Sequence, residues 1–357
     1  MAKFTGQLKA NEIFGALFNM IISQQVFTDN IKGTYSSLVD AAREEGSLYG
    51  DTKLYYATDC LKSSEWGNDA EAENLLKLHR PKAPECQVIT LNKFRQIALT
   101  TDNYLTKRAW GDEGSFASFN SAMKAWISDT KKIYDSTTYN SFIGTIKTTK
   151  GKQAREVDLT TATADLTGLE KANMRGQLIA QAIADLLVEM KDVSRDFNDY
   201  AFLRSYSDEA IKVIWNSKYV NEIKKVDLPT IFHKEGLVDK FEQYVLPSRY
   251  FGDIQKDGAN GDGTTIRSLV EKDYGDTHCF PGDIIPNSQT FLANEAYKVN
   301  DKVICKIVTK LPPYMSAFEV GTSFFNPKSL TETNYLTWGH NTLEYLSGKP
   351  FITISEK

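Results

Sequence analysis

The chain has 357 residues, of which 41% are hydrophobic and 25% are charged, and its formal net charge at pH 7 is −4. This length exceeds one ordinary compact domain and predicts two or three packed subregions, and the composition excludes a disordered chain. The mildly acidic balance argues against a protein that reads DNA sequence, although a locally basic face could still line a DNA-filled container.

The N-terminal segment predicts a docking helix. Six apolar residues repeat at helical spacing, and polar residues interrupt the run, which is too short and too broken for a signal peptide or a membrane span. We therefore predict an amphipathic helix at 12–26 on an N-terminal arm that covers residues 1–45. The apolar residues are Ile13, Phe14, Leu17, Phe18, Ile21 and Ile22.

Residues 46–85 are polar and rich in turn formers, and one strand is predicted near 54–58. Loops of this length are uncommon inside compact domains and often have a function. An extended arm that lies on a neighbouring subunit would explain both the length and the tryptophan in its middle. The candidate intersubunit contacts are Leu54, Tyr55, Tyr56 and Trp66.

A strand or strand pair is predicted over 86–110, and a long helix follows over 115–143. Ser115 is a candidate cap of this helix. The alternative is two shorter helices, broken near 136–138. The candidate core of the helix consists of its large apolar residues at spacings of three or four, namely Phe116, Phe119, Met123, Trp126 and Ile127.

The second half of the chain mixes short helices and strands. A helix is predicted at 169–197, a strand at 211–215, a helix at 219–225 and an extended segment at 228–233. A Gly- and Asp-rich stretch at 256–263 predicts a flexible loop. The last predicted strands cover 297–299, 302–308 and 351–354.

Motifs that carry chemistry are missing. The glycines at 258–263 fit neither a dinucleotide fingerprint nor a phosphate loop, and the aspartates there do not have EF-hand spacing. No two of the four histidines have metal-ligand spacing, and no nucleophile motif appears. The sequence therefore predicts no catalytic residue, no cofactor and no metal site.

Cysteines and basic residues complete the survey. Cys60, Cys86, Cys279 and Cys305 lie far apart, which predicts reduced and mostly buried thiols in a protein made in the cytoplasm. Lys131 and Lys132 lie on the polar side of the long helix. Either they form a solvated face, or they belong to an inner face turned towards packaged DNA, which they would contact without reading its sequence.

Several blocks of sequence resemble the major capsid proteins of short-tailed bacteriophages. Before and within the long helix the blocks are YLTKRAW at 104–110, GSFASFN at 114–120, Trp126 and YNSFIG at 139–144. Later blocks are IFHKEG at 231–236, PYMSAFEVGTSFFNP at 313–327 and LTWGH at 336–340.

The resemblance implies an α+β subunit of the Hong Kong 97 type. Its plan consists of an N-terminal arm at 1–45, an extended E-loop at 46–85, a P-domain at 86–174 that contains the spine helix at 115–143, and an axial A-domain at 175–255. Residues 256–357 then supply the flexible loop, the return to the P-domain and the C-terminal strands.

That resemblance predicts a virion protein that self-assembles into hexamers and pentamers of an icosahedral or prolate head. The expected partners are copies of the chain, the portal and other head proteins, a scaffolding protein, and double-stranded DNA bound non-specifically, with no membrane. Synthesis is expected in the cytoplasm of the bacterial host. The alternatives are a soluble enzyme with an unrecognised active site and a non-specific DNA-associated binding protein.

Overall fold

The computed structural model describes residues 37–46, 52–63, 78, 80–102, 113–148, 151–224, 242–260 and 265–357. The predicted helix at 12–26, Trp66 and the predicted extended segment at 228–233 lie outside these residues, as do the side chains of Phe116 and Phe119. None of the described helices is long and apolar enough to span a membrane.

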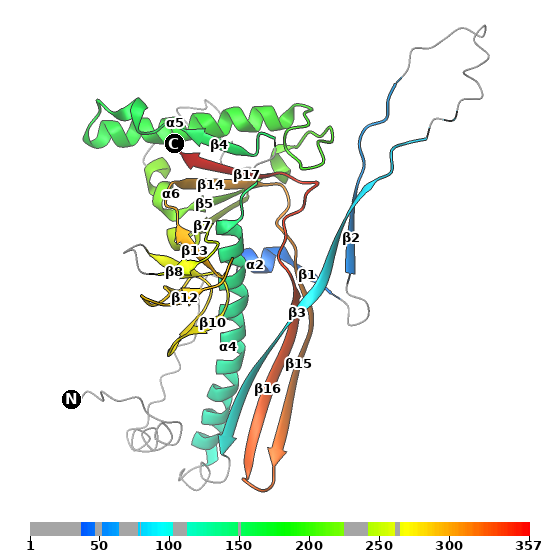
Figure 1. Cartoon of the computed structure of the whole chain (residues 1–357), viewed down its shortest axis with the longest axis vertical. Coiled ribbons are helices and arrows are strands. Elements are labelled where there is room, and N and C mark those ends of the chain that lie inside the picture. The colour runs from blue at the N-terminus through cyan, green and yellow to red at the C-terminus, as the bar shows by residue number, and fades with distance from the viewer. Residues whose placement is uncertain are drawn as a thin grey trace.

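One long helix forms the axis of the subunit (Figure 1). Helix α4, Glu113–Thr145, is a single helix of 33 residues, which at 1.5 Å per residue gives about 50 Å. The prediction of one long helix is confirmed, and the alternative of two broken helices is wrong. Ser115 lies inside the helix rather than at its cap.

A five-stranded sheet runs alongside α4 and extends past it, in the order β1-β15-β16-β3-β2. Three long strands form its ribbon, namely β3 (Glu85–Asp102), β15 (Tyr314–Asn326) and β16 (Thr331–Asn341). The short strands β1 (Arg43–Glu45) and β2 (Thr52–Ala57) pair with only one end of the ribbon. Helix α2, Ser37–Ala42, leads into β1.

A second five-stranded sheet caps one end of α4 (Figure 1), in the order β4-β17-β14-β5-β6. The strands β5 (Lys212–Asn216) and β6 (Glu242–Leu246) come from the predicted axial region at 175–255. Three partners come from outside it: β4 (Ala154–Val157), β14 (Val303–Val308) and β17 (Phe351–Glu356). The sheet therefore crosses the boundaries that the sequence suggests.

Two helices accompany this sheet. Helix α5, Gly168–Lys191, packs Ile179, Leu186 and Met190 into a core that includes Ile304 and Ile352 of the sheet. Helix α6, Ser217–Lys224, follows β5 directly. Among the described residues, the remaining helical pieces are three 3-10 turns, Thr161–Thr163, Asp208–Ala210 and Ser248–Tyr250.

A small β region lies beside α4 and is built from short strands (Figure 1). Its own core contains Ile266, Tyr274 and Phe291. The predicted flexible loop at 256–263 includes one of these strands, β8. The strands are β7 (Gly252–Ile254), β8 (Gly258–Ala259), β9 (Ile266–Ser268), β10 (Lys272–Tyr274), β11 (Thr277–Cys279), β12 (Thr290–Phe291) and β13 (Ala296–Val299).

The cysteines divide evenly between surface and core. Cys279 and Cys305 are buried, whereas Cys60 and Cys86 are exposed, and all four are free thiols. The prediction of mostly buried thiols is therefore wrong for two of them. Cys86 lies on the exposed side of β3, where alternate side chains face solvent.

Lys306 is fully buried in the middle of β14. Its Nζ donates a hydrogen bond to the backbone carbonyl of Ile146, just past the end of α4, and lies 5.3 Å from the centre of the Phe351 ring. Burial holds the pKa of Lys306 well below its usual value, and the nearby charge of Lys147 acts in the same direction. The charge that opposes this shift is that of Asp253.

This buried lysine makes the stability of the subunit depend on pH. Between its lowered pKa and the ordinary value of roughly 10.4, the unfolded chain binds one proton that the folded chain does not bind. Stability therefore rises with pH over that window. We expect Lys306→Met to lack this part of the rise when melting temperatures are compared from about pH 7 to about pH 10. Equal slopes in the two proteins would show that Lys306 is charged when buried.

Candidate functional site

A buried carboxylate joins the long helix to the ribbon. Asp135 on α4 is almost fully buried, and its Oδ1 accepts a hydrogen bond of 2.6 Å from the hydroxyl of Tyr314 on β15. Its Oδ2 lies 3.1 Å from Nζ of Lys131 and 3.4 Å from Nη2 of Arg43 on β1. A carboxylate with donors from three elements fixes their relative positions, because a shift of any one of them would break one of its buried contacts.

Lys131 takes part in this junction. Its side chain is 8% exposed and pairs with Asp135 and, at 3.2 Å, with Glu319 of β15. The prediction of an inner-face position for DNA contact is therefore wrong for Lys131, because its charge is used inside the subunit. Lys132 is exposed and pairs with Asp129 at 3.5 Å, so its contact with DNA stays a prediction.

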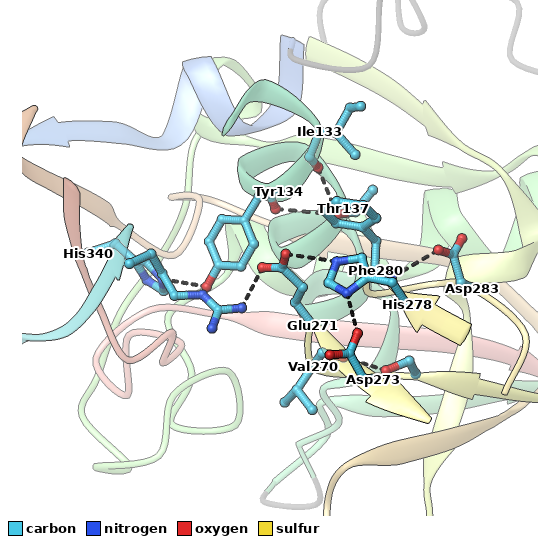
Figure 2. Close-up of polar contacts among 12 residues, drawn as sticks. Ile133, Tyr134, Thr137, Val270, Glu271, Asp273, His278, Phe280, Asp283 and His340 are labelled. Atoms are coloured by element: carbon cyan, nitrogen blue, oxygen red, sulfur yellow. Dashed lines mark hydrogen bonds and ion pairs between the residues drawn. The ribbon is translucent and has the colours of Figure 1, made fainter. Parts of the chain in front are cut away.

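A second polar contact lies beside the first. The Nδ1 of His340 donates to the backbone carbonyl of Asn341 at 2.8 Å, so its Nε2 accepts the hydroxyl proton of Tyr134, also at 2.8 Å. Burial lowers the pKa of His340, which keeps the ring neutral and fits this tautomer. The guanidinium of Arg95 lies 4.8 Å from the centre of the Tyr134 ring. Figure 2 shows this junction between α4 and the ribbon.

The chain of contacts continues into the small β region (Figure 2). Arg95 pairs with Glu271, whose Oε1 lies 3.1 Å from Nε2 of His278. The Nδ1 of His278 lies 2.6 Å from Oδ1 of Asp273, and this hydrogen bond is the main cause that raises the pKa of His278. The alternating charges tie the β10–β11 hairpin to β3. Within the described residues, no group of three or more His, Cys, Asp or Glu could hold a metal.

The ribbon turns an apolar face away from α4. The register places Val320 and Thr337 opposite each other, and likewise Phe324 and Thr333, so these side chains share one face. Phe324 is 61% exposed and Phe94, on the same face of β3, is 59% exposed. We call Phe94, Val320 and Phe324 the ribbon patch. Val320, Thr322 and Phe324 alternate with smaller residues at a period of two. This pattern could have predicted a strand here from the sequence.

A second apolar patch lies on the pair of strands β2 and β3. Leu54 is directly opposite Val88, and both are exposed, as is Tyr56. We call Leu54, Tyr56 and Val88 the arm patch. Large apolar side chains that gather on extended strands are typical of contact surfaces rather than of a solvated face.

Tyr55 points the other way from the arm patch. Its hydroxyl donates to Oε2 of Glu44 at 2.8 Å, and its ring packs on a small core that contains Ile89, Met315 and Leu346. The prediction of Tyr55 as an intersubunit contact is therefore corrected, because strand alternation turns it into its own subunit.

Glu44 receives two lysines as well as Tyr55. Burial alone would raise its pKa, but hydrogen bonds from Lys53, Tyr55 and Lys310 lower the pKa of Glu44 to about 2. Glu44 of strand β1 therefore holds strand β2 in place through Lys53 and Tyr55.

A second clamp lies just past β2. The Oδ2 of Asp59 pairs with Nη1 of Arg195 at 2.8 Å, and its Oδ1 accepts the backbone N–H of Leu203 at 3.1 Å. The hydrogen bond from Arg195 is the largest cause that lowers the pKa of Asp59 to about 2. Arg204 donates to the carbonyl of Thr58. Thr58 and Asp59, just past β2, are thus held in place by these contacts.

Trp126 lies on the exposed side of α4. Its side chain is 63% exposed, whereas Met123 and Ile127 are buried. The prediction that Trp126 belongs to the core of the subunit is therefore wrong. The buried face of the helix contains Met123, Ile127 and Lys131. Trp126 lies outside this face.

We expect Trp126→Asp to leave the isolated subunit folded, with a change of unfolding free energy within about 0.5 kcal/mol, as for ordinary surface substitutions. The neighbouring change Ile127→Asp is the matched control. It should cost several kcal/mol, because it places an unpaired carboxylate in the core. Thermal unfolding by circular dichroism measures both. Equal losses in the two variants would show that Trp126 is buried.

Comparisons with known proteins find similarity in the fold and not in the sequence. Neither protein-family models nor curated proteins give a match to the sequence. A chain from the capsid structure of Staphylococcus phage Andhra matches with a TM-score of 0.59 at 10% identity, covering 100% of this chain and 88% of that chain. A chain from the structure of the head fiber and inner core protein gp22 of native bacteriophage P68 matches with a TM-score of 0.60 at 10% identity, covering 93% and 87%.

At this level of identity the likeness lies in the architecture, which is shared over almost the whole length of both chains. The α+β fold class that the sequence resemblance implies is confirmed, and the chain has the Hong Kong 97-type fold of a bacteriophage capsid protein.

Proposed function

We propose that this chain is the major capsid protein of a tailed bacteriophage. In this proposal it self-assembles into hexamers and pentamers that form the icosahedral or prolate head around double-stranded DNA. The observation that carries the proposal is the match of the whole chain to a phage capsid structure, at a TM-score of 0.59. The match spans the whole of this chain and 88% of the other chain.

The surface chemistry supports the same proposal. The ribbon patch and the arm patch expose large apolar side chains on extended strands that lie to one side of α4 (Figure 1). The side chains of the two patches are 43% to 64% exposed in the single subunit. A shell needs only weak contacts at each interface, because each subunit makes many of them at once. Extended strands supply such contacts without a large globular body.

The contacts support an assignment of the parts of the proposed capsid subunit. We assign residues 46–85 as the E-loop, with its base fixed by Glu44 and Asp59. Helix α4 and the ribbon form the P-domain, with α4 as the spine helix. The second sheet with α5 and α6 forms the axial A-domain, so that region takes strands from residues 154–157, 303–308 and 351–356 besides its own.

The partners in this proposal are further copies of the chain, the portal and other head proteins, a scaffolding protein and packaged DNA. Lys132 is the one inner-face candidate from the long helix whose side chain is exposed. The virion is then the place of function, after synthesis in the cytoplasm of the host. The rival enzyme and DNA-associated functions have no contact on the described residues that favours them.

The ribbon patch gives a test of the proposal that separates assembly from folding. Phe324→Lys should reduce the yield of shells at least about tenfold, because each copy would bury a charge at the interface. The melting temperature of the unassembled subunit should stay the same, since the side chain is 61% exposed.

Phe324→Leu is the control, because it keeps an apolar side chain at the same place. Shell yield is measured by sedimentation and negative-stain microscopy of the purified chain. Shells formed by Phe324→Lys as well as by the unchanged protein would remove the ribbon patch from the interface. Specific turnover of a metabolite, or salt-dependent DNA binding by the free monomer, would favour the rival functions.

A further inference from the structure

Two histidines lie at the ends of one chain of polar contacts that leads from the ribbon, past α4, to the β10–β11 hairpin (Figure 2). His340 of β16 hydrogen-bonds to Tyr134 of α4, and the guanidinium of Arg95 lies against the Tyr134 ring. Arg95 pairs with Glu271, which contacts His278. The two rings have opposite surroundings, since His340 is almost fully buried whereas half of the His278 side chain is exposed.

The contacts of His278 require its ring to carry a positive charge. Both ring nitrogens lie within hydrogen-bond distance of a carboxylate oxygen, Nδ1 at 2.6 Å from Asp273 and Nε2 at 3.1 Å from Glu271. An ionised carboxylate only accepts hydrogen bonds, so both nitrogens must donate, and only the imidazolium has two N–H groups. A neutral ring would turn a lone pair towards one of the carboxylates. Loss of the proton therefore makes one of the two attractive contacts repulsive.

His340, in contrast, makes its contacts as a neutral ring. Its Nδ1 donates to the backbone carbonyl of Asn341, and its Nε2 accepts the hydroxyl proton of Tyr134. A second proton would leave Nε2 without a lone pair, so the Tyr134 hydroxyl could no longer donate to it. It would also place a positive charge in a buried junction, which is costly. Gain of a proton by His340 therefore weakens the first contact of the chain.

Charged and titratable groups from several elements face the two rings. Those around His278 come from the hairpin region and from β3, namely Glu271, Asp273 and Arg95. Those around His340 come from α4, β3 and β15, namely Tyr134, Asp135, Lys93, Arg95 and Tyr314. Lys272 of the hairpin pairs with Glu295 instead. Arg95 belongs to both sets and therefore links the two ends of the chain of contacts.

The hairpin belongs to a small β region whose two ends meet. The chain enters this region at Phe251 and leaves it at Asn300, whose backbone N–H donates to the carbonyl of Phe251 at 2.9 Å. The region has a core of its own. Figure 1 shows β7 and β13 near the second sheet and β10 further along α4. The region is thus fixed at its neck, and loss of the contact between Glu271 and Arg95 would free the hairpin without unfolding that core.

We infer that the contacts from His340 to Asp273 form a pH-sensitive latch, which holds the hairpin on the ribbon while His278 is charged and His340 is neutral, and which opens when the pH leaves that window on either side. The inference goes beyond the proposed capsid function. It concerns a movement within one subunit, so it can be tested without assembly of a shell.

His278 sets the alkaline side of the window. The hydrogen bond to Asp273 raises the pKa of His278, with partial burial against it and the hydrogen bond to Glu271 in its favour. With a pKa above the ordinary value of roughly 6.5, the folded chain binds this proton more tightly than the unfolded chain does. The stability that follows is complete below roughly pH 6.5 and is lost as the pH rises through the raised pKa.

His340 sets the acid side of the window. Burial lowers the pKa of His340, and the charges of Arg95 and Lys93 act in the same direction, whereas Asp135 opposes them. The unfolded chain therefore binds this proton at a higher pH than the folded chain does. Stability falls as the pH drops from roughly 6.5 through the lowered pKa. Because the two histidines depart from one ordinary pKa in opposite directions, the latch is tightest near pH 6.5.

His278→Arg tests the alkaline side, because arginine stays charged and can donate to both carboxylates. Chemical denaturation of the unassembled full chain gives the unfolding equilibrium constant from about pH 5 to about pH 9. Above roughly pH 6.5 we expect the unchanged protein to lose at least about threefold relative to His278→Arg, the size expected of a half-exposed ion pair. Lys306 is present in both proteins, so its contribution cancels. A difference that does not vary with pH would overturn the inference.

His278→Gln is the matched control, because its side chain is neutral at every pH. It lacks the stabilisation that the charged ring supplies, so it should be less stable than the unchanged protein below roughly pH 6.5. The two proteins should converge as the pH rises and the histidine loses its proton. Persistence of the full difference at about pH 9 would show that the charge of His278 does not hold the latch.

Hydrogen–deuterium exchange locates the opening. After correction for the intrinsic dependence of exchange on pH, the amides of β10 and β11 should exchange slowest near pH 6.5 and at least about threefold faster at about pH 5 and about pH 9. The alkaline increase should vanish in His278→Arg, while the acid increase stays. Amides of α5 are the internal reference. Constant protection of the hairpin over this range, or a parallel change in α5 that shows a general loosening, would contradict the inference.

His340→Gln tests the acid side. The amide oxygen of glutamine can accept the Tyr134 hydroxyl proton, and glutamine never gains a charge. We expect the acid increase in hairpin exchange to vanish in this variant, while the alkaline increase stays. An unchanged acid increase in the folded variant would show that His340 does not set this side of the window. If this buried substitution unfolds the subunit, the His278 variants still decide the inference.

Discussion

Replacing Asp135 with alanine should lower the unfolding free energy of the subunit by about 3–5 kcal/mol. The carboxylate is almost fully buried and pairs with Lys131, while it accepts hydrogen bonds from Tyr314 and Arg43. Its removal leaves the ammonium of Lys131 buried, with Glu319 as its remaining partner. Removal of one partner from a buried ion pair costs far more than the pair itself contributes, because the remaining charge stays buried with fewer partners, which explains the size of the expected loss.

The control for this prediction lies on the same helix. Asp129 pairs with the exposed Lys132 at 3.5 Å, so Asp129→Ala should cost less than about 1 kcal/mol, as exposed ion pairs do. Chemical denaturation of both variants under the same conditions gives the comparison. A loss for Asp135→Ala no larger than that for Asp129→Ala would show that the buried junction does not hold the ribbon on α4.

Gly144→Ala should also destabilise the subunit. A Cβ at this position of α4 would overlap the carbonyl oxygen of Tyr250 and lie 2.5 Å from its carbonyl carbon. Backbone atoms cannot rotate away, so the helix and the Ser248–Tyr250 turn would have to separate. The cost of such overpacking is about 1–3 kcal/mol, and it must also outweigh the roughly 1 kcal/mol by which alanine favours a helix over glycine.

Gly321 provides the matched control for Gly144. A Cβ there meets no atom within 4 Å, and the residue lies in an extended strand where alanine fits. Gly321→Ala should therefore leave stability unchanged or raise it slightly, because the unfolded chain loses conformational freedom. Melting temperatures of the two variants are the measurement. A stable Gly144→Ala protein would mean that α4 does not pack closely on this turn.

Local pattern was enough to find the regular elements. The long helix, the helix that starts near 169 and the strands near 212, 303 and 351 all have runs of apolar residues at the right period. Two quoted blocks, at 313–327 and 336–340, turn out to be neighbours, since Ser316 pairs with His340 and Gly321 with Leu336. The sequence shows each block but not their pairing, which is set by the fold.

The errors on α4 have one physical cause. The prediction placed Trp126 in the core because it is a large apolar residue at helical spacing, and Lys131 on the polar side of the helix because of its charge. In the structure Lys131 is buried because Asp135 and Glu319 supply opposite charges, and Glu319 is distant in sequence. This shifts the buried face of the helix away from Trp126. Residue type alone does not reveal a charge whose partner comes from another element.

The candidate contact surface could be predicted only in part. Leu54 and Tyr56 are exposed on β2, whereas Tyr55 between them is anchored by Glu44. A six-residue strand in a polar segment gives no signal of which face is turned inward, because either register alternates equally well. The ribbon patch lies on strands far apart in the chain, and only their pairing brings Phe94 and Phe324 to one face.

The central claim, that this chain builds a shell, is tested most directly by cryo-electron microscopy of particles that the purified full-length chain forms, alone or with a scaffolding partner. The account predicts closed shells of hexamers and pentamers. In each subunit the density should hold α4 and the ribbon in the arrangement described, with the ribbon patch and the arm patch covered by neighbouring copies. Monomers or small closed oligomers under every condition, or shells that leave both patches open to solvent, would contradict it.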